Sequence, residues 1–550
     1  MRARILTAWL LGAAFLALAA ACAPEVKDNT KSVPPCSGCT DTTLEQAPTF
    51  TVTPLTPTSA TLEWTLPTDP AFSGVVIRRS ATGYVTSASA GTAVYDTLGN
   101  AGVTTYTDTT LSVADSYYYS LLAYYSARGN YSWPRFAFRR MPWTLVAQGH
   151  SGLHSLAVRG EGLTWGWGFN GSGQTGDNTT TNWSGPVRVC AAAACTSYQT
   201  GMTALSTGGE HSLGIAADGS AWAWGNNGGY GPLGDGTLLN RKAPVQVCAP
   251  GTISGCSTFL GNIVSIAAGF QHSLAADGNG AVWAWGQNNS FQLGDDSASP
   301  HTVPVQVCGV GTPGCMGTLG GITAVAAGDK HSLALDSTAN VFAWGDESLG
   351  QLGNGENLST TSQTTPVQVC AENQMAPCSA FLGSIQAIAA GGDFSVALDG
   401  SGNVWTWGSN SAGQLGDGTN TLRNVPGKVC AAGQSASCSA FLSGIVAVTA
   451  GFSYAMALDS AGNVWAWGNN TYGQLGNGTL TDSKVPVQVC APGTSSGCST
   501  FLSNVAQIGG GRFHSLAIRG DGTLWGWGDN ENGEVGDNSG ITRAIPVQVP

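Results

Sequence analysis

The sequence predicts an all-β protein in which a small β-sandwich precedes a seven-bladed β-propeller. Its 550 residues include 78 glycines and 24 prolines but only 10% charged residues, which excludes a coiled coil or a helical solenoid. With 42% hydrophobic residues and 18 tryptophans, the chain is not disordered as a whole. After residue 143 a Trp-x-Trp-Gly motif recurs seven times, once with Phe for the first Trp, at a period of about 60 residues.

The N-terminus is predicted to export the chain. Arg2 and Arg4 precede an apolar run over 5–21, which is the pattern of a signal peptide at residues 1–21. A single-pass membrane anchor is the alternative, but a run of this length that is rich in alanine is short for spanning a bilayer.

The segment Leu-Ala-Ala-Ala-Cys at 18–22 resembles a bacterial lipobox. The resemblance implies that Cys22 is lipidated, although Ala19 stands where leucine is usual. Because Ala23 follows instead of Asp, it also implies an outer-membrane or cell-surface lipoprotein. Residues 22–46 are polar and aperiodic, which predicts a lipidated flexible tether, and the pair Cys36 and Cys39 is expected to form a small local disulfide.

Residues 47–142 change to short alternating segments separated by Pro, Gly and Asp, which predicts a sandwich of about seven strands. The segment around Trp64 and the Tyr-rich stretch near 117–125 resemble a fibronectin type III domain. The resemblance implies that Trp64 is the core aromatic and Tyr117 the corner tyrosine. The tyrosines are expected to face the core, with a binding patch as the alternative, and the domain to act as a spacer.

Residues 143–550 repeat a unit of four strands, as in NIVSIAAG, HSLAAD, AVWAWG and PVQVC. The two aromatics of each motif are two positions apart, so both point to one face of a strand, and the flanking glycine permits close approach of a neighbouring backbone. Seven such units predict seven blades. The motif pairs are Trp165/Trp167, Trp222/Trp224, Trp283/Trp285, Phe342/Trp344, Trp405/Trp407, Trp465/Trp467 and Trp525/Trp527.

These copies, for example AAGFQHSLAADGNGAVWAWGQNNSFQLGDD followed by VPVQVC, resemble the regulator of chromosome condensation repeat. The resemblance covers about residues 143–550 and implies a seven-bladed propeller. Members of that family include a nuclear nucleotide-exchange factor for a small GTPase and a secreted bacterial inhibitor of β-lactamases. The copies in this chain are longer than is typical because each has a cysteine-containing loop after PVQVC.

Twelve of the 15 cysteines form six local pairs in the repeats. Zinc would need four ligands with a second pair or a histidine nearby, so disulfides and an oxidising compartment are the expectation. The pairs are Cys190–Cys195, Cys248–Cys256, Cys308–Cys315, Cys370–Cys378, Cys430–Cys438 and Cys490–Cys498.

Two recurrent positions invite a chemical interpretation. One holds histidine in five repeats, but Phe394 and Tyr454 replace it in two others, which favours planar packing over a catalytic or metal-binding ring. The other holds Asp or Asn in LGDG-like turns, where a turn role is preferred to calcium because calcium needs several clustered oxygens. No cofactor and no metal are predicted. The positions are His154, His211, His272, His331 and His514, and Asp235, Asp295, Asn354, Asp417 and Asn477.

Topology predicts where the repeats could bind a partner. In a four-strand meander the first-to-second and third-to-fourth loops emerge on one face, and these loops differ most among the repeats. Aromatic anchors mixed with charges there are typical of an interface hot spot, with ordinary loop variation as the alternative. The candidate residues are Phe270, Gln271, Asp329, Lys330, Phe452, Arg512, Phe513, Tyr230, Phe291 and Tyr472. The disulfide loops are expected on the opposite face.

The predicted function is therefore that of an exported, lipid-anchored, non-catalytic protein that binds a protein or glycan outside the cytoplasm, as a monomer. From residue 149 onward, 11 Lys and Arg stand against 24 Asp and Glu, which disfavours nucleic acid. The alternatives are a polysaccharide-acting enzyme, which would need acid pairs converging in the propeller funnel, and a structural envelope component.

Overall fold

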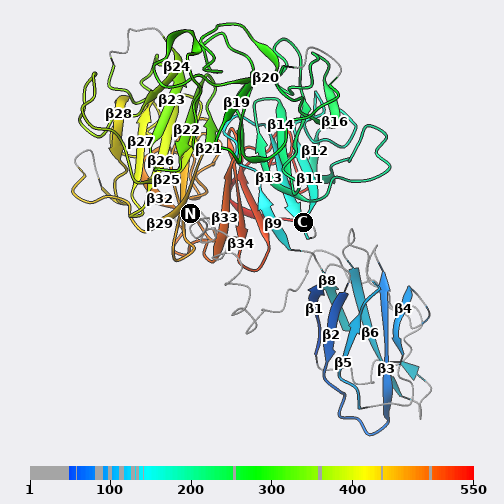
Figure 1. Ribbon diagram of the computed structural model, residues 1–550. Helices are drawn as coiled ribbons and strands as arrows, with labels where there is room; N and C mark the ends of the chain where they lie inside the picture. Colours follow the sequence, from blue (N-terminus) through cyan, green and yellow to red (C-terminus); the bar gives the residue numbers. More distant parts are fainter. Residues whose placement is uncertain are drawn as a thin grey trace. The chain divides into compact units, whose positions relative to one another are not determined.

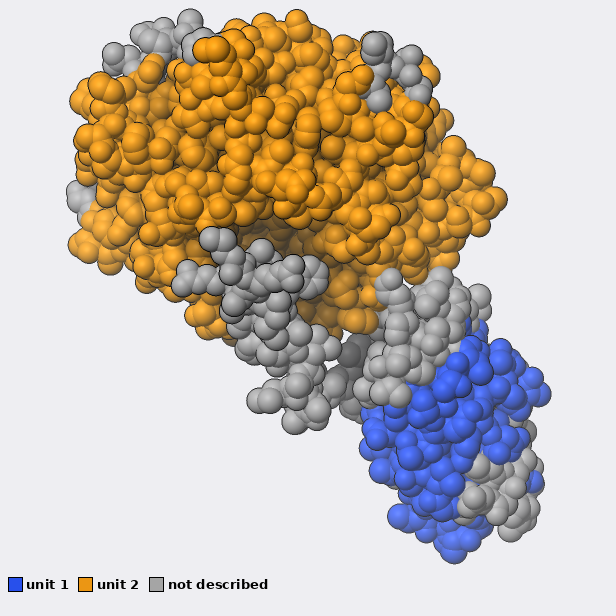
Figure 2. Space-filling model, viewed as in Figure 1, with its two compact units in different colours: residues 1–141 blue, residues 142–550 orange. Residues whose placement is uncertain are grey.

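The computed structural model describes residues 49–56, 59–80, 89, 91–96, 102–110, 117–125, 130–131, 135–139, 142–160, 162–251, 256–356, 362–434, 438–494 and 498–550. Two compact units divide at residue 141: residues 1–141 and residues 142–550, coloured separately in Figure 2. Cys22, Cys36 and Cys39 lie outside the described residues. In the part of the chain described here, no helix has the length and apolar character that crossing a membrane requires.

The first unit has two antiparallel sheets that share one core. One sheet has the order β1-β2-β5, and the other has β4-β3-β6-β7 with β8 also paired to β6. Trp64 is buried between residues of both sheets, including Leu62 and Ile77. The strands are β1 (Phe50–Thr56), β2 (Ser59–Trp64), β3 (Phe72–Ser80), β4 (Thr92–Asp96), β5 (Thr105–Asp108), β6 (Tyr117–Tyr125), β7 (Asn130–Tyr131) and β8 (Arg135–Arg139).

Two tyrosines of β6, Tyr117 and Tyr119, lie in the core of this unit, and the Tyr119 hydroxyl reaches back along the chain. The Tyr119 hydroxyl donates to Asp108 Oδ2 at 2.9 Å, and Arg79 Nη1 lies 2.6 Å from the same oxygen. Tyr117 instead lies under the Arg79 guanidinium, 4.6 Å from it. Positions two apart on one strand share a face, so sequence spacing could not separate the two tyrosines.

In the second unit, seven four-stranded antiparallel sheets follow one another among the described residues, each with its strands in chain order. Sheet 1 contains β9 (Trp143–Val146), β10 (His154–Arg159), β11 (Leu163–Gly168) and β12 (Trp183–Arg188). Sheet 2 contains β13 (Met202–Thr207), β14 (His211–Ala216), β15 (Ala221–Gly225) and β16 (Arg241–Gln246). Sheet 3 contains β17 (Ile263–Ala268), β18 (His272–Asp277), β19 (Val282–Gly286) and β20 (His301–Gln306).

Sheet 4 contains β21 (Ile322–Ala327), β22 (His331–Asp336), β23 (Val341–Gly345) and β24 (Gln363–Gln368), preceded by a single 3-10 turn, η2 (Pro313–Cys315). Sheet 5 contains β25 (Ile385–Ala390), β26 (Phe394–Asp399), β27 (Val404–Gly408) and β28 (Arg423–Lys428). Sheet 6 contains β29 (Ile445–Ala450), β30 (Tyr454–Asp459), β31 (Val464–Gly468) and β32 (Ser483–Gln488). Sheet 7 contains β33 (Val505–Gly510), β34 (His514–Arg519), β35 (Leu524–Gly528) and β36 (Arg543–Val549).

Neighbouring sheets pack in the same way along the whole series. The second strand of each sheet contacts the first strand of the next, and β34 of sheet 7 contacts β9 of sheet 1 (Figure 1). The second tryptophan of each motif is fully buried, and its indole N–H donates to a loop carbonyl of the preceding sheet, as Trp224 does to Gln174 at 2.8 Å. Trp167 of sheet 1 makes the same bond to Glu534 of sheet 7 at 2.8 Å, so the first sheet meets the last through the same contact.

Candidate functional site

The recurrent histidines connect neighbouring sheets. Each Nε2 contacts the serine hydroxyl that follows the equivalent histidine or aromatic of the next sheet, and burial lowers the pKa of the five imidazoles to about 3. The pairs are His154–Ser212 (2.7 Å), His211–Ser273 (2.9 Å), His272–Ser332 (3.1 Å), His331–Ser395 (3.0 Å) and His514–Ser155 (2.7 Å). These rings are neutral structural groups that both pack and hydrogen-bond. The hydrogen bond was not foreseen from the sequence.

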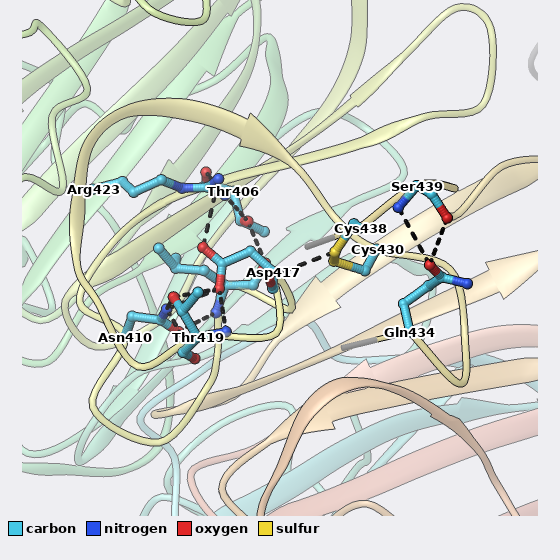
Figure 3. Close-up of a disulfide and its surroundings, with 10 residues drawn as sticks. Thr406, Asn410, Asp417, Thr419, Arg423, Cys430, Gln434, Cys438 and Ser439 are labelled. Carbon is cyan, nitrogen blue, oxygen red and sulfur yellow. Dashed lines mark hydrogen bonds and ion pairs between the residues drawn. A yellow bond between two sulfur atoms is a disulfide. The ribbon is translucent and has the colours of Figure 1, made fainter. Parts of the chain in front are cut away.

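The Asp or Asn of the LGDG-like turns holds the turn itself. Asp417 Oδ1 accepts from the N–H and the hydroxyl of Thr419 at 2.9 and 2.8 Å and from Asn410 Nδ2 at 3.2 Å (Figure 3). Arg423 Nη1 lies 3.5 Å from Asp417 Oδ2. The carboxylate is thus engaged by its own loop, which is the arrangement that the turn interpretation requires.

The structure joins all six cysteine pairs of the repeats as disulfides. Topology predicted the third-to-fourth loops on one face and the disulfide loops on the other, but part of the third-to-fourth loop contacts the disulfide. The Cys430 N–H donates to the Gly416 carbonyl at 2.9 Å, and Cys438 Sγ lies 3.6 Å from the Asp417 carbonyl oxygen (Figure 3). The loop therefore runs back along its sheet, and its LGDG turn supports the disulfide.

The connections between the first and second strands form a group that we call the central turns. They comprise residues 147–153, 208–210, 269–271, 328–330, 391–393, 451–453 and 511–513. Backbone hydrogen bonds link neighbouring turns in succession: Asp329 N–H to Gly392 O (2.9 Å), Gly392 N–H to Phe452 O (3.0 Å), Phe452 N–H to Arg512 O (3.2 Å) and Arg512 N–H to Gly152 O (3.0 Å). Variable residues from different sheets are thereby held side by side.

Five of the ten predicted binding residues meet in one group, which we call the Arg512 cluster. The guanidinium carbon of Arg512 lies 4.9 Å from the Phe452 ring centre, 5.3 Å from Phe513 and 5.9 Å from Phe270. Tyr472, from the third-to-fourth loop of sheet 6, lies 5.2 Å from Phe513 between ring centres. All five side chains are partly exposed, so the cluster packs against the rest of the protein and also presents surface to a partner.

A second cluster, made of polar side chains, also lies among the central turns. His150 Nε2 is 3.0 Å from Asp329 Oδ1, and the Ser151 hydroxyl donates to the same oxygen. Burial acts to raise the pKa of Asp329. The opposing effects are larger and keep that pKa below its usual value: they are the hydrogen bond and charge of His150, the hydrogen bond of Ser151 and the charge of Arg512. Burial, together with the charge of Asp329, raises the pKa of Asp393 in the next turn.

Sequence reasoning missed His150 and Ser151. They belong to the first central turn, which has seven residues where the other central turns have three, and this turn brings sheet 1 into contact with Asp329 of sheet 4. The extra length was visible in the sequence as the insertion before His154. It was the available signal that this turn reaches beyond its neighbours.

The other predicted residues are less closely grouped. Lys330 is exposed beside Asp329, and the Gln271 carbonyl accepts the Gln287 N–H at 2.9 Å. The Tyr230 hydroxyl lies 3.4 Å from Asn289 Nδ2. Within the described residues, no ring contact joins Tyr230 or Phe291 to the Arg512 cluster.

A cavity of about 220 Å³ lies between the first strands of several sheets. Its lining consists of Leu, Val, Ile and Ala side chains from β9, β13, β29 and β33 and their flanks, together with Gln148 and Gln507. Both amides are engaged, since Gln148 Nε2 donates to the Ile508 carbonyl at 2.7 Å and Gln507 Nε2 to that of Thr144 at 2.8 Å. No acid lines this cavity.

The sheets and turns define a repeat protein of propeller type with a variable surface at its central turns. Comparison with protein families gives the same result: the RCC1-like domain matches residues 312–550, and regulator of chromosome condensation (RCC1) repeats match residues 218–276 and 279–335. The chain belongs to this RCC1 repeat family.

Similar proteins have diverse names. Ultraviolet-B receptor UVR8 of Arabidopsis thaliana is 30% identical over 63% of this chain and 69% of its own length. Secretion-regulating guanine nucleotide exchange factor of Bos taurus is 29% identical over 63% and 70%. The E3 ubiquitin-protein ligase HERC2 of Homo sapiens is 29% identical over 71% of this chain but only 7% of its own length.

Solved structures show the same fold at low identity. Prp20p from Saccharomyces cerevisiae superposes with a TM-score of 0.54 at 20% identity, covering 74% of this chain and 87% of that one. Human WBSCR16 gives a TM-score of 0.53 at 21% identity, covering 70% and 89%. At this identity the likeness concerns the fold.

Proposed function

We propose that this chain is an exported, lipid-anchored display protein whose central turns bind a protein or glycan outside the cytoplasm without catalysis. In this proposal the seven sheets are the blades of a closed propeller, and the first unit is a fibronectin type III-like spacer on a tether attached through Cys22. The six disulfides support an oxidising compartment. Nucleotide exchange on a cytoplasmic GTPase is not proposed, because an exported chain would not meet one.

The Arg512 cluster is the observation that carries the proposal. It places three phenylalanine rings around one guanidinium, with Tyr472 against one of those rings, and aromatic residues and arginine contribute much of the binding energy in protein interfaces. The scaffold is suited to such a role, since Prp20p, which has the same fold, has binding properties to Gsp1p and histones. Five aromatic and cationic side chains from the turns of three sheets meet there.

The test is capture of partners from envelope extracts by the full chain and by the F270A/F452A/F513A variant. We expect the variant to lose the captured partners. A matched control changes Phe259, Phe381 and Phe441, three phenylalanines of the disulfide loops that are 46%, 46% and 44% exposed, to Ala. Equal recovery by the wild type and the first variant, or a loss confined to the control, would contradict binding at the central turns.

One observation favours the enzyme alternative. Asp329 and Asp393 lie in adjacent central turns, and their pKa values are displaced in opposite directions, as in acid–base pairs of hydrolases. If this pair acted on polysaccharide, the purified chain would release reducing ends from envelope glycan, and D393N would abolish the release. Release of reducing ends that depends on Asp393 would replace the non-catalytic proposal.

A further inference from the structure

The Arg512 guanidinium has a rigid apolar setting. Three phenylalanine rings lie within 6 Å of its central carbon, so their electron-rich faces stabilise the cation while excluding water from its faces. The backbone of Arg512 is fixed on both sides by hydrogen bonds to the turns of sheets 6 and 1. The orientation of the guanidinium is thus set before any partner arrives.

The same guanidinium has no acceptor of its own. Its Nε is buried without a hydrogen-bond partner, and no ion pair or side-chain hydrogen bond to Arg512 is found among the described residues. Arginine stays charged at every physiological pH and presents N–H donors in a planar fork. The buried Nε faces the protein interior, but the side chain is partly exposed and its terminal N–H groups also have no partner among the described residues, which favours an acceptor supplied from outside.

Asp329 of the central turns does not fill this role. Asp329 acts on Arg512 through its charge, but its Oδ1 is engaged by His150 and Ser151. This carboxylate therefore remains beside the guanidinium as a fixed negative charge. It disfavours ligands of high negative charge.

We propose that the Arg512 cluster is a receptor for a single carboxylate, that of a Glu or Asp side chain flanked by apolar residues in a partner protein. The inference rests on the proposed function and names the chemistry of its partner. A carboxylate accepts two parallel hydrogen bonds from the fork, and the phenylalanine rings accommodate the neighbouring apolar side chains. Phosphate groups carry nearly two negative charges and meet repulsion from Asp329 and Asp393.

A protein carboxylate fits the site better than an acidic sugar. The rings of Phe270, Phe452 and Phe513 have no polar tip, whereas the hydroxyls of a uronic acid would need several donors and acceptors around the carboxylate. Apart from Arg512, the cluster offers only the Tyr472 hydroxyl. An acidic side chain between apolar residues makes no such demand.

The experiment measures binding of two acetylated, amidated tripeptides, Leu-Glu-Leu and Leu-Gln-Leu, to the full chain by isothermal titration calorimetry. We expect Leu-Glu-Leu to bind at least about tenfold more tightly than Leu-Gln-Leu, as the loss of a charged hydrogen bond predicts. R512Q should remove this preference, and R512K should reduce it because lysine lacks the fork. The matched control is R519Q, since Arg519 lies in the same sheet but pairs with Asp521 at 3.4 Å.

Three results would overturn the inference: equal affinity of R512Q and wild type for Leu-Glu-Leu, no binding of Leu-Glu-Leu up to about 10 mM, or tighter binding of glucuronate than of Leu-Glu-Leu. Thermal unfolding of R512Q shows whether the variant is folded, and R512K provides a second readout if it is not. If partner capture depends on the three phenylalanines but is unchanged in R512Q, the proposed function stands and the carboxylate receptor is wrong.

Discussion

Glu347 departs from a residue pattern that the other six repeats share. In those sheets the position holds Asn, whose amide donates to the Asp or Asn of the LGDG-like turn, as Asn227 does to Asp235 at 2.9 Å. In sheet 4 the acid and the amide are exchanged, and Asn354 Nδ2 donates to Glu347 Oε2 at 2.7 Å. The carboxyl is fully buried with Oε1 unpaired, and burial raises its pKa to about 8.

This exchange predicts a pH-dependent stability. The Glu347 carboxyl has a pKa of about 8 in the folded chain and 4.5 as a free side chain, so between these values the folded state holds a proton that the unfolded state has lost. Its contribution to the free energy of unfolding is therefore complete below about pH 4.5 and declines as the pH rises towards 8. Glu347→Gln should remove this decline and stabilise the chain at pH 8 by about 1–3 kcal/mol.

Urea unfolding at pH 5 and pH 8 measures the effect. Exposed Glu372→Gln is the matched control and should leave the pH dependence as in the wild type. An unchanged difference between the two pH values in Glu347→Gln would mean that Glu347 is ionised in the folded chain.

The histidine–serine pairs give a second prediction at the residue scale. Sheet 5 replaces the histidine with Phe394, and sheet 6 replaces the serine that would face it with Ala455, so both partners became apolar within one buried cluster. Ser212→Ala alone should leave His154 Nε2 unpaired and cost about 1–3 kcal/mol. His154→Phe combined with Ser212→Ala copies the natural pair and should cost less than the sum of the single changes.

A double-mutant cycle of unfolding free energies tests this coupling. If the unfolding free energies lost in the two single variants simply add up in the double variant, the His154–Ser212 hydrogen bond contributes nothing beyond packing.

At the scale of elements, sequence analysis predicted the strands that recur in all seven repeats, but it missed the course of the third-to-fourth loop and a contact made by one longer turn. The strands around the Trp-x-Trp-Gly motif follow from alternation and glycine turns. The return of the third-to-fourth loop towards the disulfide could not be predicted, because topology alone assigns a loop to the face where it begins. The contact of His150 with Asp329 depends on one longer turn, and periodicity carries no information about a turn without copies.

The return of that loop predicts the effect of losing one disulfide. Cys430 and Cys438 close a loop with a sequence separation of 8 residues, and the Gly416–Asp417 backbone lies against it. Replacing both cysteines with serine should cost about 2–3 kcal/mol through chain entropy, and protease cleavage near Gly416 should become faster.

Urea unfolding and limited proteolysis of the double variant measure the two effects, with the Cys190/Cys195 double variant as a control for the site of cleavage. Unchanged cleavage near Gly416 would show that this turn does not depend on its disulfide.

For the second unit as a whole, sheets 7 and 1 meet through side-chain contacts and backbone hydrogen bonds between loops, and not through an exchanged strand. All four strands of sheet 1 and all four of sheet 7 come from their own repeats, so the first and last sheets meet through contacts such as Trp167 to Glu534 and Ser155 to His514. If the ring is closed in solution, Trp167→Phe should cost the same as Trp285→Phe inside the series, about 1–3 kcal/mol each. A much smaller cost for Trp167→Phe in urea unfolding would indicate that sheets 1 and 7 separate.

Anchoring of the whole molecule is the remaining prediction. Two acyl signals on one cysteine hold a protein stably at a bilayer, whereas the acidic chain itself, with a net charge of −12, is repelled by anionic lipid surfaces. Cys22→Ala should therefore move the chain from the membrane fraction to the soluble fraction, and processing of the wild type should be blocked by globomycin. Cys36→Ala, a change outside the lipobox, is the control and should leave fractionation unchanged. If Cys22→Ala still sediments with membranes after a salt wash, the chain is held there by something other than a lipid on Cys22.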